Sequence, residues 1–346
     1  MVAYPRDVVS SSTPPILDRA RRLTEPALRR AIDGLLPALR DPARYHFGWT
    51  DAEGNDVAGG GGKGVRGALS ILSAEAVGAS GEIAIPGAVA VELVHNFSLL
   101  HDDIIDGDTE RRHRPTVWSL WGESQAIIVG DALHSLALEE LLANSGSESA
   151  RAAARLATST GAMIAGQSDD MTFDQRTDVT FDDCLAMEAN KTGALIAFSS
   201  SVGAVLAGAA DDQIDALTTF GAAVGLAFQA IDDLLGIWGD PASTGKAVGN
   251  DLRERKRSMP VTAALHSGHG AAAEIATVYG SAEPIDDEAI ERLQVLIEEA
   301  GGKDRTRAVA TEQFDLAIAA LDAATFVPVA AGELRDMAAF IVERNF

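Results

Sequence analysis

Apolar residues recur every three or four positions along most of this chain, which is the spacing of one face of an α-helix. The first such segment runs from Ile16 to Leu39, with arginine and aspartate on its other face. Eight further segments repeat the pattern, at residues 69–77, 88–105, 124–142, 152–166, 186–207, 214–235, 290–300 and 334–342. No region alternates β-branched and polar residues between Asn-Gly or Asp-Gly turns, so a sheet is not expected. The pattern predicts an all-α protein.

The segments between these helices contain no linker that would divide the chain. Residues 45–63 begin with aromatic side chains and continue with glycine, aspartate and asparagine, which predicts a loop. Residues 283–288 predict a second, acidic loop. Residues 1–14 are rich in serine and proline and are expected to be a flexible N-terminal segment. We therefore expect one large helical-bundle domain over residues 15–346.

Charge and cysteine content restrict the classes of partner. The 346 residues include 28 basic and 51 acidic side chains, a net charge of −23, whereas nucleic-acid binding needs a basic surface. The single cysteine, Cys184, leaves no internal disulfide, and the first residues lack a signal-peptide pattern. The uncharged run Thr192–Ala210 is long enough to span a membrane, but three serines and three glycines dilute it, so a core helix is expected. We expect a cytoplasmic protein that inserts in no membrane and binds no nucleic acid.

Two clusters of aspartates each close a strongly apolar helix. The first is His-Asp-Asp-Ile-Ile-Asp at residues 101–106, and the second is Asp232-Asp233. On a helix, Asp102 and Asp106 share one face and repel each other. A solvated helix end is the ordinary explanation of an acidic pair, but the apolar helix before each cluster places these carboxylates at the mouth of a buried space. Because Mg²⁺ prefers one or two carboxylates together with substrate phosphates, the two clusters predict facing carboxylate walls that hold metal ions and a diphosphate.

Lysine is scarce enough for its positions to carry information. Only five of the 28 basic residues are lysine: Lys63, Lys191, Lys246, Lys256 and Lys303. The first follows a run of glycines that opens a helix, where backbone N–H groups can approach phosphate oxygens. The next three lie at the start of a core helix and in the polar segment after the second aspartate cluster, and Lys303 is assigned to the surface. A lone lysine is usually a solvated charge, but four at such places favour a phosphate-binding site.

These motifs, in order and spacing, resemble those of the trans-isoprenyl diphosphate synthases (polyprenyl synthetases) from about Gly61 to the C-terminus, most of all the geranylgeranyl diphosphate synthases. The matching elements are DDIIDGDTERR at 102–112, His95 and Ser98, Gly166-Gln167 with Asp170, Lys191-Thr192, Phe228-Gln229 with Asp232-Asp233, and Lys246 with Asp251 and Lys256. The chain departs from the family pattern in three glycines. Gly236 replaces the third aspartate of the second motif, and Gly64 and Gly67 replace a basic residue and a proline near Lys63.

The resemblance implies an isoprenoid-synthase bundle with a central substrate cavity and a short-chain prenyltransferase activity. The enzyme would ionise an allylic diphosphate (dimethylallyl, geranyl or farnesyl) with Mg²⁺, three ions when substrate is bound, and condense it with isopentenyl diphosphate. The implied metal ligands are Asp102, Asp103, Asp106 and Asp232, and the implied cations at the leaving diphosphate are Lys191, Lys246 and Lys256. Isopentenyl diphosphate would be bound by Lys63, Arg66, His95 and Arg112. Further implied substrate-binding residues are Arg111, Thr192, Gln229 and Asp233, the last as an orienting group or as a ligand through water.

Phe97 is the candidate determinant of product length, with Ser98 beside it as a small residue. At 1.5 Å per residue, Phe97 lies ~7–8 Å below Asp102 along the helix, where a large side chain would act as a floor for the growing chain. The resemblance associates a single aromatic at this position with a C20 product, or with C15 when further bulk is present. We therefore expect geranylgeranyl diphosphate first, a C15 product second and much longer chains third. The alternative is that Phe97 is ordinary core packing. His101 and His134 are assigned to structure.

Two other functions remain open on the sequence. A terpene cyclase on the same scaffold is weakly favoured by the missing basic residue at position 64 and opposed by the four candidate groups for isopentenyl diphosphate. A regulatory subunit of a heteromeric synthase would have eroded aspartate motifs, whereas the first motif is intact. A homodimer is expected because family members are generally dimeric and because the apolar helices outnumber what one bundle easily buries.

Overall fold

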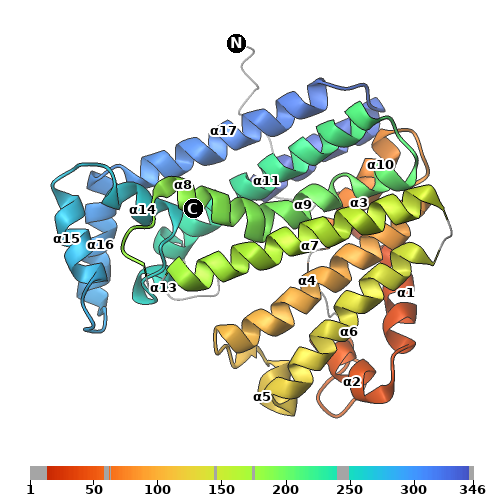
Figure 1. The fold of residues 1–346 in the computed structure, drawn as a ribbon, viewed down its shortest axis with the longest axis horizontal. Helices are drawn as coiled ribbons and strands as arrows, with labels where there is room; N and C mark the ends of the chain where they lie inside the picture. The colour runs from red at the N-terminus through yellow and green to blue at the C-terminus, as the bar shows by residue number, and fades with distance from the viewer. Residues whose placement is uncertain are drawn as a thin grey trace.

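The computed structural model describes residues 14–57, 62, 64–143, 146–173, 176–239 and 249–342, and these form a helical bundle (Figure 1). The first half of the chain begins with two helices that cross one end of the bundle and continues with its central helices. These elements are α1 (Pro15–Asp33), α2 (Pro37–His46), α3 (Val65–Ala76), η1 (Gly81–Ala84), α4 (Ile85–Ile105), α5 (Val117–Trp121), α6 (Glu123–Leu142) and α7 (Ser147–Phe173). Between α4 and α5, β1 (Glu110–Arg111) and β2 (Arg114–Pro115) form a two-stranded hairpin.

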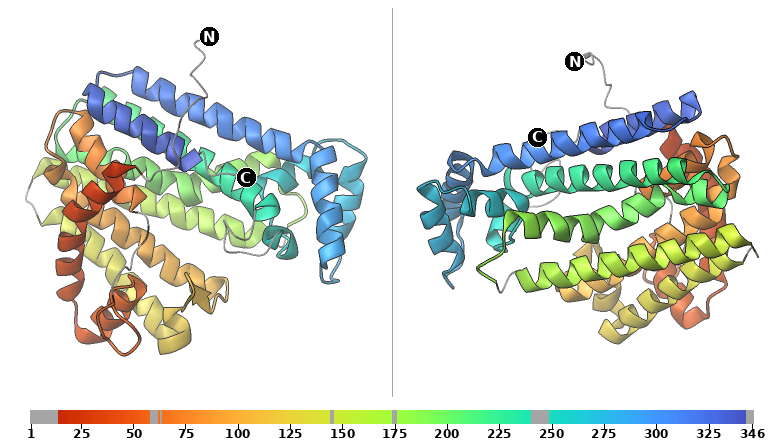
Figure 2. Two further views of the ribbon diagram at one scale, coloured as in Figure 1. Left: turned by 180° about the vertical axis from the view of Figure 1, so that it is seen from behind. Right: turned by 45° about the horizontal axis from the view of Figure 1, so that its top comes forward.

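The second half completes the bundle and adds a group of short helices at its opposite end. Its elements are α8 (Phe181–Glu188), the π-helical turn η2 (Ala189–Gly193), α9 (Ala194–Ser199), α10 (Val202–Leu206), α11 (Asp211–Trp238), α13 (Asn250–Arg253), α14 (Met259–Leu265), α15 (Ala271–Tyr279), α16 (Asp287–Glu299), α17 (Gly302–Asp322) and α18 (Pro328–Val342). Figure 2 shows α17 and α18 side by side along one face of the bundle, with α15 and α16 extending beyond it. The expected all-α architecture is confirmed.

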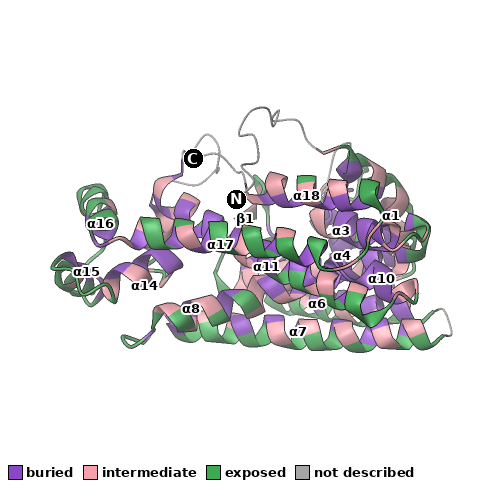
Figure 3. Cartoon of the chain, turned by 90° about the horizontal axis from the view of Figure 1, so that it is seen from above, coloured by how far each residue is buried: buried purple, intermediate pink, exposed green. Residues whose placement is uncertain are grey.

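The two helices that carry the aspartate clusters lie at the centre of the fold. Helix α4 packs against α3 and α6, and α11 packs against α9 and α17. Figure 3 shows α3, α4 and α10 enclosed by the rest of the chain, whereas α7 exposes its outer face. One large apolar core joins α1 to α11 with α17 and α18, and a separate apolar cluster joins α13 to α16. The aspartates therefore stand at the ends of rigid, buried helices, where their positions are fixed.

Several element boundaries differ from the sequence expectation, each for a local reason. The segment 16–39 is two helices, because Gly34 ends α1 and Pro37 begins α2. The segment 186–207 is broken by η2 and again near Ser200, where the hydroxyls of Ser199 and Ser201 bond back to carbonyls one turn earlier. Helix α17 was not expected, since alanines and a threonine supply much of its buried face.

Two helices are long and apolar enough to cross a membrane by length and composition, the stretch Gly81–Ile105 and Asp211–Trp238. In both, 61% of the most apolar window is buried inside the protein. The uncharged run Thr192–Ala210 forms short helices instead of one membrane-spanning helix. The apolar character of α4 and α11 is explained by their place in the core.

Candidate active site between the two aspartate clusters

The end of α4 forms the first acidic wall. Burial raises the pKa of Asp102 to about 6, with Lys191 opposing the rise and Asp106 adding to it. Burial also raises the pKa of Asp106, against the charges of Lys191 and Lys256. Two half-desolvated carboxylates and two lysines from distant elements thus meet in one place, as the sequence predicted.

Asp103, predicted as a metal ligand, is bonded to another side chain in this structure. Its side chain is 2% exposed, and Oδ1 accepts a 2.6 Å hydrogen bond from Nε of Arg111 in the hairpin. Its Oδ2 is buried without a hydrogen-bond partner in the described structure. Asp103 lies one step round the helix from Asp102, so it faces the hairpin. It holds Arg111 through Nε, while the Arg111 side chain stays 29% exposed and lines a small cavity.

The second acidic wall, on α11, also has one exposed and one buried aspartate. Asp232 is exposed, whereas Asp233 is 4% exposed and fully bonded within the protein. The Oδ1 of Asp233 accepts from Nε2 of Gln229 at 2.9 Å, and its Oδ2 accepts from the Met259 backbone N at 2.8 Å. Thr192 Oγ1 donates to Gln229 Oε1 at 3.1 Å. Of the roles left open for Asp233, the structure supports the orienting one.

Lys191 enters the site from the π-helical turn η2. Such turns re-aim a side chain within a helix and are frequent at functional sites. Its Nζ forms an ion pair with Asp170 of α7. Burial acts to lower the pKa of Lys191, but the nearby carboxylates, Asp170 foremost, raise it overall. A Cβ on Gly166 would overlap the Lys191 backbone, so this glycine allows α7 to approach the turn closely. The three residues therefore act together: Gly166 lets α7 approach the turn, and Asp170 then pairs with Lys191.

Lys256 is the second lysine that the structure describes at this site. Burial opposes its charge, but Asp251 and Glu254 outweigh burial and raise the pKa of Lys256. Its Nζ lies 3.2 Å from Glu254 Oε2. Lys246, predicted beside it, lies outside the described residues, as does Lys63.

A cavity of about 550 Å³ brings together the other predicted group of residues. Arg66 of α3, His95 of α4 and Arg112 of the hairpin loop all line it, and it extends to Phe228 of α11, next to Gln229. Burial, together with Arg66 and Arg112, lowers the pKa of His95 well below its usual value, so this imidazole is neutral. Three of the four residues predicted to bind isopentenyl diphosphate are therefore neighbours, and the fourth, Lys63, lies outside the described residues.

The same cavity contains an acid that the sequence analysis missed. Glu92 lines it, and the Gly67 backbone N donates to Glu92 Oε1 at 3.2 Å. Burial raises the pKa of Glu92, and the nearby Arg66 guanidinium opposes that rise. A single glutamate within the apolar run of α4 was the available signal. Glu92 balances the charge of Arg66 and fixes the start of α3.

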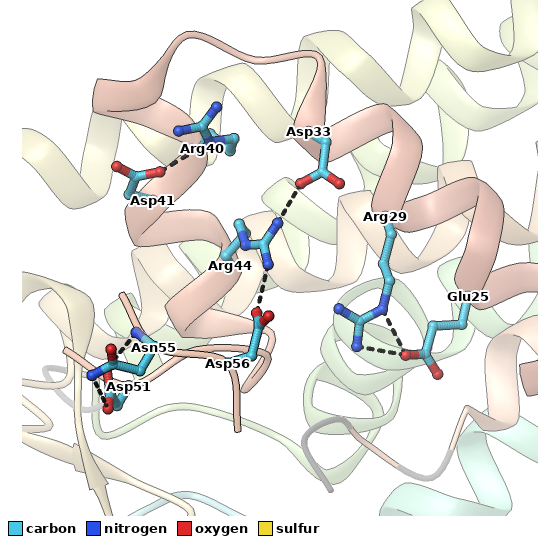
Figure 4. Close-up of polar contacts among 9 residues, drawn as sticks. All are labelled: Glu25, Arg29, Asp33, Arg40, Asp41, Arg44, Asp51, Asn55 and Asp56. Atoms are coloured by element: carbon cyan, nitrogen blue, oxygen red, sulfur yellow. Dashed lines mark hydrogen bonds and ion pairs between the residues drawn. The ribbon is translucent and has the colours of Figure 1, made fainter. Parts of the chain in front are cut away.

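The predicted loop after α2 supplies an aromatic wall of this cavity. Phe47 and Trp49 line it, with ring centroids 4.9 Å apart in a stacked arrangement. Figure 4 shows Arg44 between Asp33 and Asp56, which ties the loop to the end of α1. The guanidinium of Arg29 covers the Trp49 ring at 4.3 Å. Side-chain contacts thus hold the first part of the loop in place against the cavity, which its glycine-rich sequence did not suggest.

His46 stands at the end of α2 beside a smaller cavity of about 300 Å³ that Arg111 and Arg112 also line. Its Nε2 is buried without a hydrogen-bond partner in the described structure. Burial, then the charges of Arg111 and Arg112, lower the pKa of His46 to about 3. The folded protein therefore keeps this imidazole neutral across the physiological range.

Acid is expected to destabilise the protein through His46. The unfolded chain takes up a proton near pH 6.5, whereas the folded chain does so only near pH 3, so stability is lost as pH falls below 6.5. Between pH 7.5 and 5.5, the wild type should lose about 1 kcal/mol more unfolding free energy than His46→Gln. Urea unfolding of both proteins at the two pH values measures this difference. Parallel pH dependences would contradict the neutral buried imidazole.

Phe97 lies between α4 and α6 and not in the 550 Å³ cavity. It is 8% exposed, and its ring contacts those of His101 at 4.8 Å and His134 at 5.2 Å between centroids. Ser98 Oγ donates to the His95 carbonyl at 2.8 Å. His101 Nε2 lies 3.1 Å from the Ile127 carbonyl, in keeping with the structural role assigned to it. A floor and a packing role for Phe97 are both compatible with this position.

Comparisons with known proteins agree with this arrangement. The family model for polyprenyl synthetase matches residues 49–297. The (2E,6E)-farnesyl diphosphate synthase of Mycobacterium tuberculosis is 45% identical over 98% of this chain and 95% of its own, and the geranylgeranyl diphosphate synthase of the same organism is 45% identical over 90% of each. The crystal structure of a polyprenyl synthetase from Streptomyces coelicolor superposes with a TM-score of 0.91 at 48% identity, covering 96% of this chain and 100% of that one. Some solved structures similar to this chain hold isoprenyl diphosphate with calcium or magnesium. This chain belongs to the polyprenyl synthetase family.

Proposed function

We propose that this chain, a short-chain trans-prenyltransferase by its family, condenses an allylic diphosphate with isopentenyl diphosphate to give geranylgeranyl diphosphate. One observation carries the proposal. The structure holds two distinct sets of anion-binding groups, an aspartate and lysine set between α4 and α11 and an Arg66, His95 and Arg112 set around the 550 Å³ cavity. Two diphosphate substrates need two such sets, and the cavity reaches α11 next to Gln229.

The carboxylates of the first set fit divalent metal ions. Asp102 and Asp106 share a helix face, and Asp106 raises the pKa of Asp102, a repulsion that a bound cation would relieve. Among the described residues, no three acidic, histidine or cysteine side chains converge on one point. Mg²⁺ commonly takes one or two carboxylates and completes its shell with substrate phosphates and water, so this spacing suits ions shared with a diphosphate.

We assign the direct metal ligands as Asp102, Asp106 and Asp232, with three Mg²⁺ ions in the substrate complex. Asp103 instead acts through Arg111. The ions would supply positive charge to the leaving diphosphate. Lys191, held by Asp170, and Lys256, with Lys246 from its predicted position, stabilise the same charge. Apolar side chains along the cavity, among them Ile196 and Phe340, exclude water from a reacting cation.

The second set binds isopentenyl diphosphate without metal. Arg66 and Arg112 bring the positive charge, and neutral His95 contributes a hydrogen bond between them. Lys63 joins them by its sequence position. Glu92 holds the start of α3 through the Gly67 backbone N and places a negative charge near Arg66 at the edge of the cavity.

An incubation with purified protein tests this function. The protein is given Mg²⁺ and farnesyl diphosphate, with and without isopentenyl diphosphate, and the products are identified. We expect a C20 diphosphate that forms only when both substrates are present. A hydrocarbon from farnesyl diphosphate alone would instead identify a terpene cyclase. Product from geranyl or dimethylallyl diphosphate but not from farnesyl diphosphate would identify a C15 synthase, and absence of product from all three with an intact, metal-loaded protein would indicate a regulatory subunit.

Product length is expected to depend on Phe97. Replacing Phe97 with alanine should move the main product to a longer chain, because the side chain nearest below Asp102 is removed from this face. Product chromatography measures the change, and a thermal melt confirms that the variant is folded. If Phe97 is packing alone, the product stays the same and stability falls by ~3–5 kcal/mol. Leu133→Ala, fully buried on α6, is the matched control for a core truncation.

We propose a cytoplasmic homodimer built through α6. Ile127 and Ile128 on this helix are 43% and 52% exposed, and Leu142 at its C-terminal end and Leu120 on the preceding α5 are exposed as well. Such an apolar face suits a second copy of the chain. Light scattering should give twice the monomer mass, and Ile128→Asp should give the monomer mass. A wild-type monomer at micromolar concentration would refute the assignment.

A further inference from the structure

Arg112 stands at the tip of the β1–β2 hairpin, on a backbone conformation that arginine does not favour. Arg112 and His113 form the whole two-residue loop of this hairpin, and their φ angles are +53° and +61°. Such a loop is usually built from asparagine and glycine, because the left-handed region is strained for other residues. Contacts outside the loop must therefore hold Arg112 in place.

The side chain of Arg112 packs against the glycine-rich segment that precedes α3. A Cβ on Gly62 would lie 3.2 Å from Nη2 of Arg112, which is tighter than an ordinary contact. The Gly62 carbonyl in turn accepts a 3.1 Å hydrogen bond from Nη2 of Arg21 on α1. Arg112 and Gly62 line the 550 Å³ cavity together with Arg66. A shift of the hairpin would therefore move this guanidinium away from the place where isopentenyl diphosphate is proposed to bind.

The end of α2 and the loop after it hold this hairpin through Arg114, which follows the two-residue loop. Nη1 of Arg114 donates to the Tyr45 carbonyl at 3.2 Å, and Nη2 donates to the Thr50 carbonyl at 2.7 Å. The guanidinium also lies over the Tyr45 ring, 4.1 Å from its centroid. One planar, forked side chain thus fixes β2 to two backbone carbonyls and one aromatic face.

Tyr45 bonds back to the same strand. Its hydroxyl donates to the Pro115 carbonyl at 2.8 Å, and its ring packs edge-on against Trp121 of α5, with 5.1 Å between the centroids. Tyr45 is 5% exposed and Thr50 is 4% exposed, so these bonds are shielded from water. We call the reciprocal contacts of Tyr45 and Arg114 the hairpin brace. Neither of its two residues lines the 550 Å³ cavity.

We propose that Tyr45 and Arg114 are positioning residues for isopentenyl diphosphate: the hairpin brace holds the strained loop so that Arg112 faces the 550 Å³ cavity. The inference rests on the proposed function, because it explains how one residue of that substrate site is oriented. The brace touches no substrate itself, so its loss should act on isopentenyl diphosphate only through Arg112.

Steady-state kinetics with each substrate varied in turn test the proposal. Arg114→Gln should raise KM for isopentenyl diphosphate about tenfold and change KM for the allylic diphosphate by less than about threefold, because only one substrate loses an aligned contact. Arg114→Lys keeps the charge but not the fork, so its KM for isopentenyl diphosphate should stay at least about threefold above the wild type. Tyr45→Phe removes only the hydroxyl on Pro115 and should raise the same constant by about two- to threefold. A wild-type KM for isopentenyl diphosphate in Arg114→Gln or Arg114→Lys would overturn the proposal.

Coupling to Arg112 separates positioning from a general structural role. In the Arg112→Gln background, Arg114→Gln should change KM for isopentenyl diphosphate by less than about twofold, since no guanidinium is left to orient. A further rise as large as that in the wild-type background would overturn the proposal. Thermal melts establish which variants are folded, and if Arg114→Gln is not, Arg114→Lys is combined with Arg112→Gln for the same comparison. Arg155→Gln, which removes a part-buried bond to Thr218 between α7 and α11, is the matched control and should leave both constants unchanged.

Failure of the proposed function has a different signature. Arg112→Gln alone reports on the substrate site itself. If it raises KM for isopentenyl diphosphate and the variants of Tyr45 and Arg114 do not, the site stands and only the brace is refuted. If Arg112→Gln leaves that constant unchanged, the assignment of the isopentenyl diphosphate site is wrong. A wild-type protein that forms no product refutes the proposed function, and with it any substrate role of the brace.

Discussion

Replacing Asp102 with asparagine is expected to lower kcat by about 10²–10³-fold and to leave the fold intact. The substitution keeps the volume of the side chain but removes a charge that the metal ions use most strongly while the C–O bond ionises. Burial raises the pKa of this carboxyl to about 6 against the attraction of Lys191, so the charged form is unfavourable on balance in the folded protein and the melting temperature should not fall. Steady-state kinetics and thermal melts measure the two effects. Activity within about threefold of the wild type would refute the two-wall site.

Two neighbouring acids control the interpretation of that result. Asp169→Asn removes an exposed carboxylate beside the Asp170–Lys191 pair and should leave kcat unchanged. Asp103→Asn removes the partner of Arg111 and should lower the melting temperature as well as activity, since it breaks a buried ion pair. A loss of activity in Asp102→Asn without loss of stability is therefore the specific signature of a metal ligand.

The sequence predicted those features that depend on short-range periodicity. The apolar repeat identified α4, α6 and α11, and the aspartate clusters near the ends of α4 and α11 followed from spacing along each helix. It also predicted that Asp103 lies one step away from the face shared by Asp102 and Asp106. The ion pair that Asp103 forms in that direction could not be predicted, because its partner, Arg111, is placed by the β1–β2 hairpin.

The features that escaped prediction depend on contacts between distant segments. The roles of Glu92 beside Arg66 and His46 beside Arg112 are created by the packing of α2, α3, α4 and the hairpin loop. The close approach of the Asp251 side chain on α13 to Gly236 on α11 is likewise created by the packing of distant segments. Local propensity also misjudged the segment 186–207, where the π-helical turn that aims Lys191 interrupts an apparently continuous helix.

Arg112 provides the second large effect, on the other substrate. Arg112→Gln is expected to raise KM for isopentenyl diphosphate by about 10- to 100-fold and to change KM for the allylic diphosphate by less than about threefold, because a bidentate phosphate contact is lost in one cavity only. Arg112 lines that cavity with Arg66 and His95, whereas its neighbour Arg111 is bonded to Asp103. Steady-state kinetics with each substrate varied in turn measure both constants.

The shape of the guanidinium can be separated from its charge by a second variant. Arg112→Lys keeps the positive charge but not the two-pronged donor, so its KM for isopentenyl diphosphate should lie between those of the wild type and Arg112→Gln. Arg22→Gln, an exposed arginine on α1, is the control for a general change in surface charge. If Arg112→Gln raised both KM values equally, the arginine would serve the allylic diphosphate or both substrates, and the division into two anion-binding sets would have to be redrawn.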